Sequence, residues 1–459
     1  MPGPMVPGKS PPARYLVTHP APACKNMAIL GNKERALRST FCGLILSLAA
    51  LGVSGALAAG IPPAPDPDQR AYIAAKLYGD LQVHFAHWQD NEGLRLDDAL
   101  RAYLAKATAA PDRLGFDLET ISFLAQFKGG RTGFSDRWLR EAYPALPFAV
   151  RWIARDWVVI RSRIDALKPG DVIVQIDGTP TERFYQDHAR FLDAGTDDAR
   201  RAALFAMPSL FPAPLSLGLA DGRTVDIDPT AAPPAPPPEV TGKWLKPDEF
   251  AYIAIPNFDA PPGGAEPQFE ARAIELVKEY TAASTLVIDL RGTGGDAPPA
   301  KLLSALMNRP YRGWATATPA SFQPAVFQHA LVSWPATAAA AGPDAYGRQL
   351  ILLIDGGCAG ACEDFVMPFK DNGRAVLIGE PTRGRAGDAI TEDLGDGMQG
   401  WISSSSVSFP NGAPLTVAGI APDVPAVRGI QDLKAGLDPV IAKVLIQTAP
   451  GAHQDRRAP

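Results

Sequence analysis

The sequence predicts an α/β fold in three parts: a helical N-terminal module, a small β-rich domain and a larger domain in which strands and helices alternate. Three successive patterns lead to this prediction. Apolar residues recur first at spacings of three and four, then in short β-rich runs between turn residues, and finally in apolar strands separated by helical segments. With 459 residues, of which 46% are hydrophobic and 20% charged, the chain is long enough for roughly two to three domains.

The helical module is expected over residues 59–147. Helical spacing of apolar residues is clearest from Arg70 to Asp80 and from Leu96 to Ala109. A Pro-rich run at 229–240 predicts a stiff, extended linker and therefore a domain boundary. The β-rich domain is expected between them, over 148–228, with strands at 157–160, 171–176 and 215–219.

The largest domain is expected over residues 241–446, before a tail at 447–459. Its strands are apolar throughout, which is typical of a largely parallel sheet that helices cover. The expected strands are 251–255, 285–290, 350–354 and 375–378, and the expected helices lie near 271–282, 300–307 and 361–370.

Residues 27–58 have the layout of a secretory signal peptide. Basic residues precede an apolar stretch at 41–57, which ends in the small-residue site Ala56-Leu57-Ala58. A membrane anchor is the alternative, but the stretch is short and runs at once into a Pro-rich segment. We therefore expect cleavage after Ala58, a periplasmic or secreted protein without membrane insertion after cleavage, and an upstream extension without function at residues 1–26.

The charge of the chain disfavours two classes of partner. The whole sequence has a formal charge of −5, and removal of residues 1–58 leaves 38 basic and 48 acidic residues, a charge of about −10. Such a protein is not expected to bind nucleic acid or an anionic membrane surface. His84 and His87 lie three residues apart with no third ligand at a recognisable spacing, so we expect ordinary helix residues and neither a metal nor a cofactor.

A run in the β-rich segment is similar to the strand–turn–strand of PDZ domains. Leu167 to Gly178 reads LKPGDVIVQIDG, against the PDZ pattern L-x-x-G-D-x-I-x-x-I-D-G. PDZ domains take an extended peptide as an added strand on a sheet edge, so the resemblance implies binding of unfolded or extended polypeptide. The alternative is a spacer that only packs against its neighbours.

Two motifs in the α/β half resemble the tail-specific (C-terminal-processing) serine peptidases. Residues 286–295 read LVIDLRGTGG, similar to that family's D-L-R-x-N-x-G-G at the end of a central strand. The second motif runs from Leu353 to Thr382 and is followed by Phe-Pro-Asn-Gly at 409–412 and Gly-Ile-Ala-Pro-Asp-Val at 419–424. The resemblance covers nearly the whole domain and implies a ClpP/crotonase-like peptidase fold.

The same motifs are suited to acyl transfer. Backbone N–H groups of a glycine-rich turn and of a small residue at a helix start can converge on one point, which is how an oxyanion hole is built. By position, Gly294 or Gly295 and Ala361 would supply these donors. The alternative for such a turn is a plain strand-to-helix connection.

At the positions where the resemblance places catalytic residues, this sequence has residues that cannot perform the catalytic roles. The nucleophilic serine corresponds to Gly360, which has no side chain to acylate. The lysine of the Ser-Lys branch corresponds to Arg385, and the histidine of the Ser-His-Glu branch to Arg131; arginine stays charged and cannot accept a proton. The glutamate of that triad corresponds to Thr416. We therefore expect the family's reaction to be lost.

Nearby residues offer few substitutes. Cys358 and Cys362 flank the vacant position, and a thiolate near a helix start and Arg385 is one alternative nucleophile. Two small buried side chains or a local disulfide are favoured, because no histidine stands in the matching motif to accept a proton. The serine run at 403–406 is expected to be a solvated strand face.

Two functions follow from these observations. The first is a non-catalytic protein that binds polypeptide, because loss of a nucleophile does not remove the edges and pockets that bind. The second is an active serine-type or thiol-using endopeptidase that acts on unfolded or C-terminal peptide segments through a displaced residue set. The presence of a nucleophile near Gly294 and Ala361 decides between them, and the sequence makes no prediction of the oligomeric state.

Overall fold

The computed structural model of the chain describes residues 60–447, except for 194, 232–235, 260–267 and 321–329. The expected signal peptide and upstream extension, almost all of the expected tail and part of the Pro-rich linker lie outside the described residues. No described helix is both long enough and apolar enough to span a bilayer.

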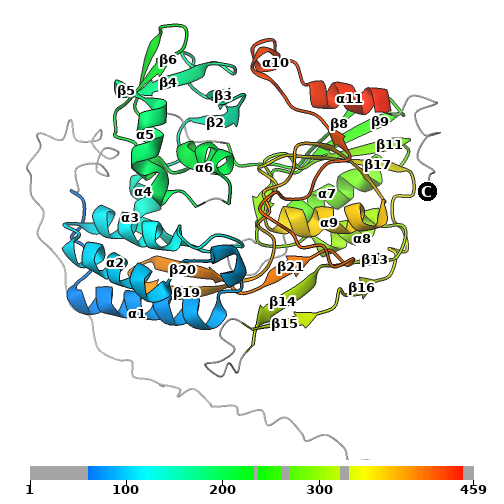
Figure 1. The fold of residues 1–459 in the computed structure, drawn as a ribbon. Helices are drawn as coiled ribbons and strands as arrows, with labels where there is room; N and C mark the ends of the chain where they lie inside the picture. Colours follow the sequence, from blue (N-terminus) through cyan, green and yellow to red (C-terminus); the bar gives the residue numbers. More distant parts are fainter. Residues whose placement is uncertain (1–59, 194, 232–235, 260–267, 321–329, 448–459) are drawn as a thin grey trace, which may run out of the picture. The chain divides into compact units, whose positions relative to one another are not determined.

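Amphipathic helices form the N-terminal part, where the apolar spacing predicts them (Figure 1). They are α1 (Pro67–His84), α2 (Leu96–Ala109), α3 (Arg113–Leu124) and α4 (Arg137–Ala142), with the 3-10 turn η1 (Trp88–Asn91) after α1. Asp66 and Asp112 accept hydrogen bonds from backbone N–H groups in the first turns of α1 and α3, which satisfies donors that a helix start leaves free.

A strand pair from late in the sequence completes this part. β1 (Gly133–Asp136) pairs antiparallel with β20 (Met398–Ser403), which pairs with β19 (Ala389–Gly395). Side chains from these two late strands, among them Met398 and Ile402, enter the same buried cluster as Leu77 and Phe123 of the helices. Figure 1 shows β19 and β20, in orange, beside the blue helices.

The β-rich part is one antiparallel sheet. Its strands are β2 (Phe148–Ile153), β3 (Asp156–Ser162), β4 (Val172–Ile176), β5 (Thr179–Pro180), β6 (Leu215–Leu219) and β7 (Thr224–Ile227), with helices α5 (Thr181–His188) and α6 (Asp197–Ala203) between β5 and β6. The strand order is β2-β3-β4-β6-β7, and β5 pairs with β4. Val159, Ile173 and Leu217 point into a buried cluster that Tyr185 of α5 closes.

The α/β part is a six-stranded sheet with helices on both faces, as the apolar strands predict. Its strands are β8 (Thr241–Lys246), β9 (Phe250–Ala254), β11 (Thr285–Asp289), β17 (Gln349–Ile354), β18 (Val376–Gly379) and β22 (Val424–Pro425). The order is β22-β18-β17-β11-β9-β8, and every pair is parallel except β8 with β9.

Two cores lie on the two faces of this sheet. Its helices are α7 (Gln268–Glu279), α8 (Ala300–Leu306), α9 (Ala361–Asn372) and α11 (Pro439–Gln447). Leu286 and Ile288 pack in one core with α7, α8 and α9, whereas Val287 packs in the other with Val440 of α11. Alternate side chains of β11 thus leave opposite faces, and this is why the strand is apolar at successive positions.

Short elements surround the α/β part. They are β10 (Asn257–Phe258), β12 (Gly294–Gly295), β13 (Tyr311–Arg312), β14 (Ala315–Pro319), β15 (Leu331–Trp334), β16 (Ala338–Ala339), β21 (Ser406–Ser408) and α10 (Ile430–Lys434). The parallel pair β10–β12 carries the glycine-rich turn, and β21 pairs with β14.

Candidate functional site

Gly360 lies on the sharp connection between β17 and α9. It is the N-cap residue of α9, with φ 60° and ψ −120°, a backbone conformation that residues with a side chain rarely adopt. A strand-to-helix turn of this kind presents its residue outward, as a nucleophile requires. The position that resembles the family's serine is therefore well placed for catalysis, but it carries no side chain.

The glycine-rich turn lies directly against this position. Gly295 has φ +122° and pairs with Phe258, and a Cβ on Gly295 would come within 2.4 Å of the Phe258 backbone, so only glycine fits. Gly294 precedes it on β12, and Ala361 is fully buried at the first position of α9. The structure thus brings the proposed oxyanion-hole residues together around Gly360.

A cavity of about 510 Å³ opens beside these glycines. Its lining includes Gly295, Gly360, Arg131 and Arg385. Thr416 does not line it: the residue is exposed, and its hydroxyl accepts a hydrogen bond from the Ala418 N–H at 3.3 Å. Three of the four positions at which the sequence departs from the peptidase pattern therefore meet at one cavity.

Glu363 holds the turn that carries Arg385. This fully buried carboxylate accepts hydrogen bonds from the Thr382 hydroxyl at 2.6 Å, the Gly384 N–H at 2.6 Å and the Arg385 N–H at 2.7 Å. Burial raises the pKa of Glu363, and the three donors oppose that rise. Glu363 has a positioning role, because its oxygens point at this turn and it is absent from the cavity lining.

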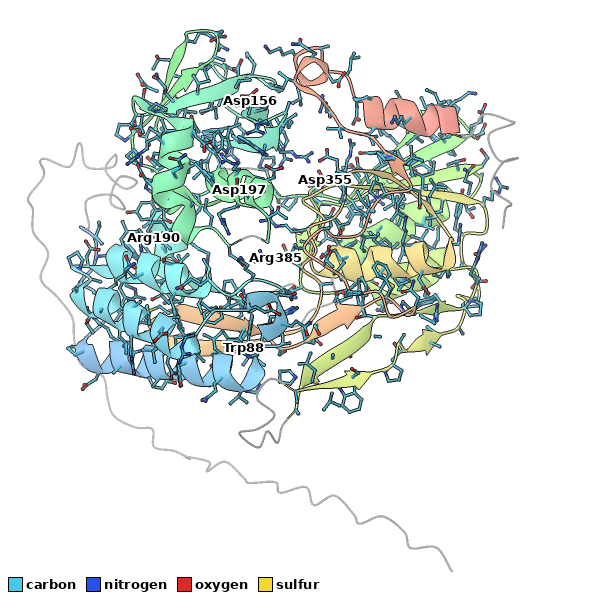
Figure 2. The ribbon with its side chains drawn as sticks, viewed as in Figure 1. Trp88, Asp156, Arg190, Asp197, Asp355 and Arg385 are labelled. Atoms are coloured by element: carbon cyan, nitrogen blue, oxygen red, sulfur yellow. A yellow bond between two sulfur atoms is a disulfide. The ribbon has the colours of Figure 1, made fainter. Side chains whose placement is uncertain are left out.

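The Arg385 side chain, which is labelled in Figure 2, connects its own turn with two other segments. Its Nε donates to the Gly130 carbonyl oxygen at 3.2 Å, and its Nη2 donates to the Asp193 carboxylate. Burial raises the pKa of Asp193, while Arg385 and Arg383 oppose that rise. Arg385 is thus held as an ion-pair partner at the position where the Ser-Lys branch has a base.

Arg131 and Arg383 line the same cavity but, unlike Arg385, form no ion pair with a described residue. Neither guanidinium group has a hydrogen bond or an ion pair with any residue that the structure describes. Burial and the nearby Arg385 lower the pKa of Arg383, and the carboxylates of Asp193 and Glu363 oppose this shift without cancelling it.

A carboxylate accepts hydrogen bonds from the turn that begins at Gly292 and from the turn that precedes Gly360. Asp355 accepts hydrogen bonds from the Gly292 N–H at 2.8 Å and the Gly357 N–H at 2.9 Å (Asp355 is labelled in Figure 2). Arg151, from β2 of the antiparallel sheet, lies 3.3 Å from Asp355 and 2.5 Å from Glu380. The β-rich part therefore contacts the same turns that form the site.

Comparison with known proteins agrees with this geometry. Residues 249–426 match the sequence model of peptidase family S41. The chain carries a peptidase family S41 domain. Over 83 residues, 18% of this chain, it is 32% identical to the chloroplastic carboxyl-terminal-processing peptidase 3 of Arabidopsis thaliana, and the match spans 16% of that relative's length. The resemblance to C-terminal-processing peptidases is thereby confirmed.

Two solved structures share the fold over most of the chain. Mature CPAF has a TM-score of 0.64 and 15% identity, covering 83% of this chain and 97% of its own. The photosystem II D1 C-terminal processing protease has a TM-score of 0.50 and 18% identity, covering 79% of this chain and 94% of its own. These similarities extend beyond the S41 domain to the helical and β-rich parts.

The two cysteines of the S41 domain are bonded to each other. Cys358 and Cys362 form a disulfide with a Cα–Cα distance of 5.3 Å, and both are fully buried. The suggestion that one of them acts as a free thiol is wrong for this structure, because neither sulfur is available as a thiolate. The disulfide encloses the Gly360 turn and ties it to the first turn of α9.

The serine run at 403–406 is not the solvated strand face that the sequence predicts. Ser403 and Ser405 are fully buried: the Ser403 hydroxyl lies against His87, and the Ser405 hydroxyl accepts a hydrogen bond from the Asp388 N–H at 2.7 Å. The expectation for His87 is also wrong: it lies in the turn after α1, is 8% exposed, and places Nε2 3.1 Å from the Ser403 hydroxyl. Its Nδ1 lies 3.3 Å from an Asp90 carboxylate oxygen.

This Ser403–His87–Asp90 chain has the order of a catalytic triad but not its exposure. The Ser403 side chain has no exposed surface and none of the three residues lines the cavity. Gly130 covers the pair, since a Cβ there would come 1.9 Å from the Ser403 hydroxyl oxygen. We interpret it as a buried polar link between the helical part and β20. His87 and Ser403 are 316 residues apart in the sequence, so local sequence patterns do not reveal this contact.

No group of three or more histidine, cysteine or carboxylate side chains in the described part of the chain is arranged to hold a metal ion.

Proposed function

We propose that this protein binds extended polypeptide beside Gly360 and does not hydrolyse it. The observation that carries the proposal is the identity of the residues that meet at the cavity: Gly360 has no side chain, and Arg131 and Arg385 cannot accept a proton. Peptide hydrolysis by a serine-type site needs a nucleophile and a base within hydrogen-bond reach of each other.

The other polar groups of the cavity do not replace them. Its hydroxyl side chains are Thr132, Ser135, Ser209 and Tyr143, and none of them has a hydrogen bond to a histidine or a carboxylate among the described residues. The two carboxylates of the lining are already paired, Asp136 with Arg113 at 2.7 Å and Asp193 with Arg385. Neither is free to activate a hydroxyl.

Two further features support a polypeptide partner and an exported protein. The family acts on polypeptide, and the antiparallel sheet that contains the PDZ-like run from Leu167 to Gly178 ends in edge strands, β2 and β7, on which a peptide strand can add. The Cys358–Cys362 disulfide agrees with an oxidising compartment, as does the signal-peptide layout of residues 27–58.

Hydrolysis of an unfolded, fluorescently quenched casein tests the proposal. The chain that begins at Ala59 is compared with a variant that restores the three triad positions, Gly360→Ser, Arg131→His and Thr416→Glu. We expect no cleavage by the unaltered chain. Cleavage by the restored chain should be detectable but weak, because a side chain at position 360 must displace the Gly295 turn and position 416 lies outside the cavity. Melting curves of both proteins establish that they are folded.

Cleavage by the unaltered chain, surviving successive purification steps, would overturn the proposal in favour of an active peptidase. Two further variants then identify the nucleophile. Ser403→Ala tests the buried Ser403–His87–Asp90 chain, which is the one arrangement of the described residues that resembles a triad. A Cys358→Ala, Cys362→Ala double variant tests a thiol released by reduction.

A further inference from the structure

The cavity beside Gly360 has an excess of positive charge in an otherwise acidic protein. Its charged lining residues are four arginines, Arg131, Arg140, Arg383 and Arg385, and two aspartates, Asp136 and Asp193. Asp136 is neutralised by Arg113, which lies outside the lining, and Asp193 by Arg385. No carboxylate of the described residues lies within ion-pair distance of the other three arginines, although Asp364 interacts with the charge of Arg131 over a longer range; Arg140 is the exposed one of the three.

The acidic groups that face Arg383 do not remove this excess. Asp193 and Glu363 both interact with its charge, but no carboxylate oxygen of either lies within ion-pair distance of the guanidinium group. Glu363 is itself occupied by three donors from the Thr382–Arg385 turn. A half-buried guanidinium without an ion-pair partner is costly, since folding removes water from the charge and the more distant carboxylates replace that hydration only in part.

The remaining wall of the cavity is apolar. It is formed by side chains from α3, β1 and α4 and from the segment between α5 and β6; they include Ile121, Phe134, Leu139, Phe191, Leu192 and Met207. A volume of about 510 Å³ is in the range of sites that enclose a small organic molecule or a few residues of a peptide. The cavity thus offers a cationic end and an apolar wall to one ligand.

We propose that this cavity is a carboxylate-binding site in which Arg131 and Arg383 receive the carboxylate of a ligand and the apolar wall receives the group attached to it. Guanidinium groups match a carboxylate in shape as well as charge, since two N–H groups donate in parallel to its two oxygens. Such a carboxylate occurs at the C-terminal end of a polypeptide with an apolar last residue, and in a small apolar acid.

The inference rests on the proposed function where the source of the carboxylate is a polypeptide, and it goes beyond that function in what it says of the site. Arginine at position 131, where the peptidase pattern has histidine, then replaces a proton acceptor by an anion receptor. The loss of the reaction and the gain of carboxylate recognition have one structural cause.

Binding of matched acids and amides tests the inference. The probes are N-acetyl-leucine and its amide, and a ten-residue peptide that ends in leucine with either a free or an amidated C-terminus; calorimetry or fluorescence anisotropy on the chain beginning at Ala59 gives each Kd. We expect the free acid of at least one pair to bind about tenfold or more tightly than its amide, the ratio that one charge-assisted contact supplies.

Arginine variants assign the contact to residues. Arg131→Gln and Arg383→Gln should each lower the affinity for the acid about tenfold and leave the amide unchanged, and Arg383→Lys should restore part of the loss because the charge remains. Arg101→Gln, at an exposed position on α2 outside the cavity, is the matched control and should change neither. Melting temperatures of all variants confirm that the fold is kept.

The outcomes separate this inference from the proposed function. Equal binding of acid and amide, or acid binding that both glutamine variants leave unchanged, would overturn the carboxylate site, and binding of unfolded casein would show that the proposed function stands without it. Acid binding by the small probe alone supports the site and assigns it to a free acid; binding by the peptide supports the site and assigns it to a chain end.

Discussion

Gly360 and Gly295 are packed so closely that a Cβ on Gly360 would stand 2.8 Å from the Gly295 carbonyl oxygen. Real Cβ atoms do not come this near to a backbone oxygen, so the two turns fit together only while residue 360 is glycine. The arrangement adds to the unusual backbone of Gly360, which has φ 60°. Reintroduction of a nucleophile at this position therefore requires a local shift of the glycine-rich turn.

The first prediction concerns this contact. Gly360→Ala and Gly360→Ser should each lower the free energy of unfolding by about 1–3 kcal/mol, since both add a Cβ in a conformation that disfavours it. Denaturant midpoints measure the change. The two variants should lose similar amounts, because the Cβ rather than the hydroxyl makes the contact; a neutral Gly360→Ala would show that the contact relaxes without cost.

The second prediction concerns the carboxylate that holds the Thr382–Arg385 turn. Glu363→Ala should lower the free energy of unfolding by on the order of 3 kcal/mol, because it leaves three donors without an acceptor in the interior. Glu363→Gln keeps the volume and one acceptor oxygen, so its loss should be smaller. If both variants melt with the unaltered protein, the turn does not depend on Glu363.

The third prediction concerns pH. Asp117 and Asp136 are fully buried and share Arg113, whose Nε lies 3.5 Å from an Asp117 oxygen and 2.7 Å from an Asp136 oxygen. Burial, with the charge of Asp136 added, raises the pKa of Asp117 from 3.8 to about 9. The folded protein thus holds a proton that the unfolded chain releases, so the free energy of unfolding should fall as the pH rises from about 4 to about 9.

Asp117→Asn tests this sign. The amide cannot ionise, so the variant should lose most of the decline in this pH window and should be more stable than the unaltered protein at pH 8. Asp344→Asn, at an exposed loop position, is the control and should keep the original dependence. Urea titrations at several pH values measure both, and an unchanged slope in Asp117→Asn would assign the pH dependence to other groups.

The fourth prediction concerns the disulfide. In the chain that begins at Ala59, Cys358 and Cys362 are the cysteines present, so titration of the denatured protein should find no free thiol before reduction and two after it. Replacement of both by serine should cost about 2 kcal/mol, the loop-closure effect of so short a ring. Free thiols in the unreduced, denatured chain would restore the thiol alternative.

The sequence predicts most of the sheet that carries the site, because each strand of its centre is an unbroken apolar run. Leu286, Val287 and Ile288 on β11 face two cores in turn, which is the burial that successive apolar residues in a strand predict. The residues around Gly360 follow equally well from local motifs, since a strand, a glycine turn and a helix start are adjacent in sequence.

What the sequence does not predict depends on contacts between distant segments. β20 completes the core of the N-terminal helices, and its last residue, Ser403, meets His87 there. The same holds for the cavity charge: Arg131 and Arg383 come from segments on either side of the β-rich part, so nothing local indicates that they line one space. Sequence patterns report the environment of a strand face but not the identity of its partner.

The central claim, that the protein binds polypeptide without cutting it, is tested most directly on the fate of a bound chain. A labelled, unfolded polypeptide is incubated with the protein that begins at Ala59, the complex is isolated by size exclusion, and the intact mass of the recovered polypeptide is measured. The account predicts a complex from which the polypeptide returns at its original mass. Recovery of discrete shorter fragments after incubation with the unaltered protein, which has glycine at position 360, would contradict it.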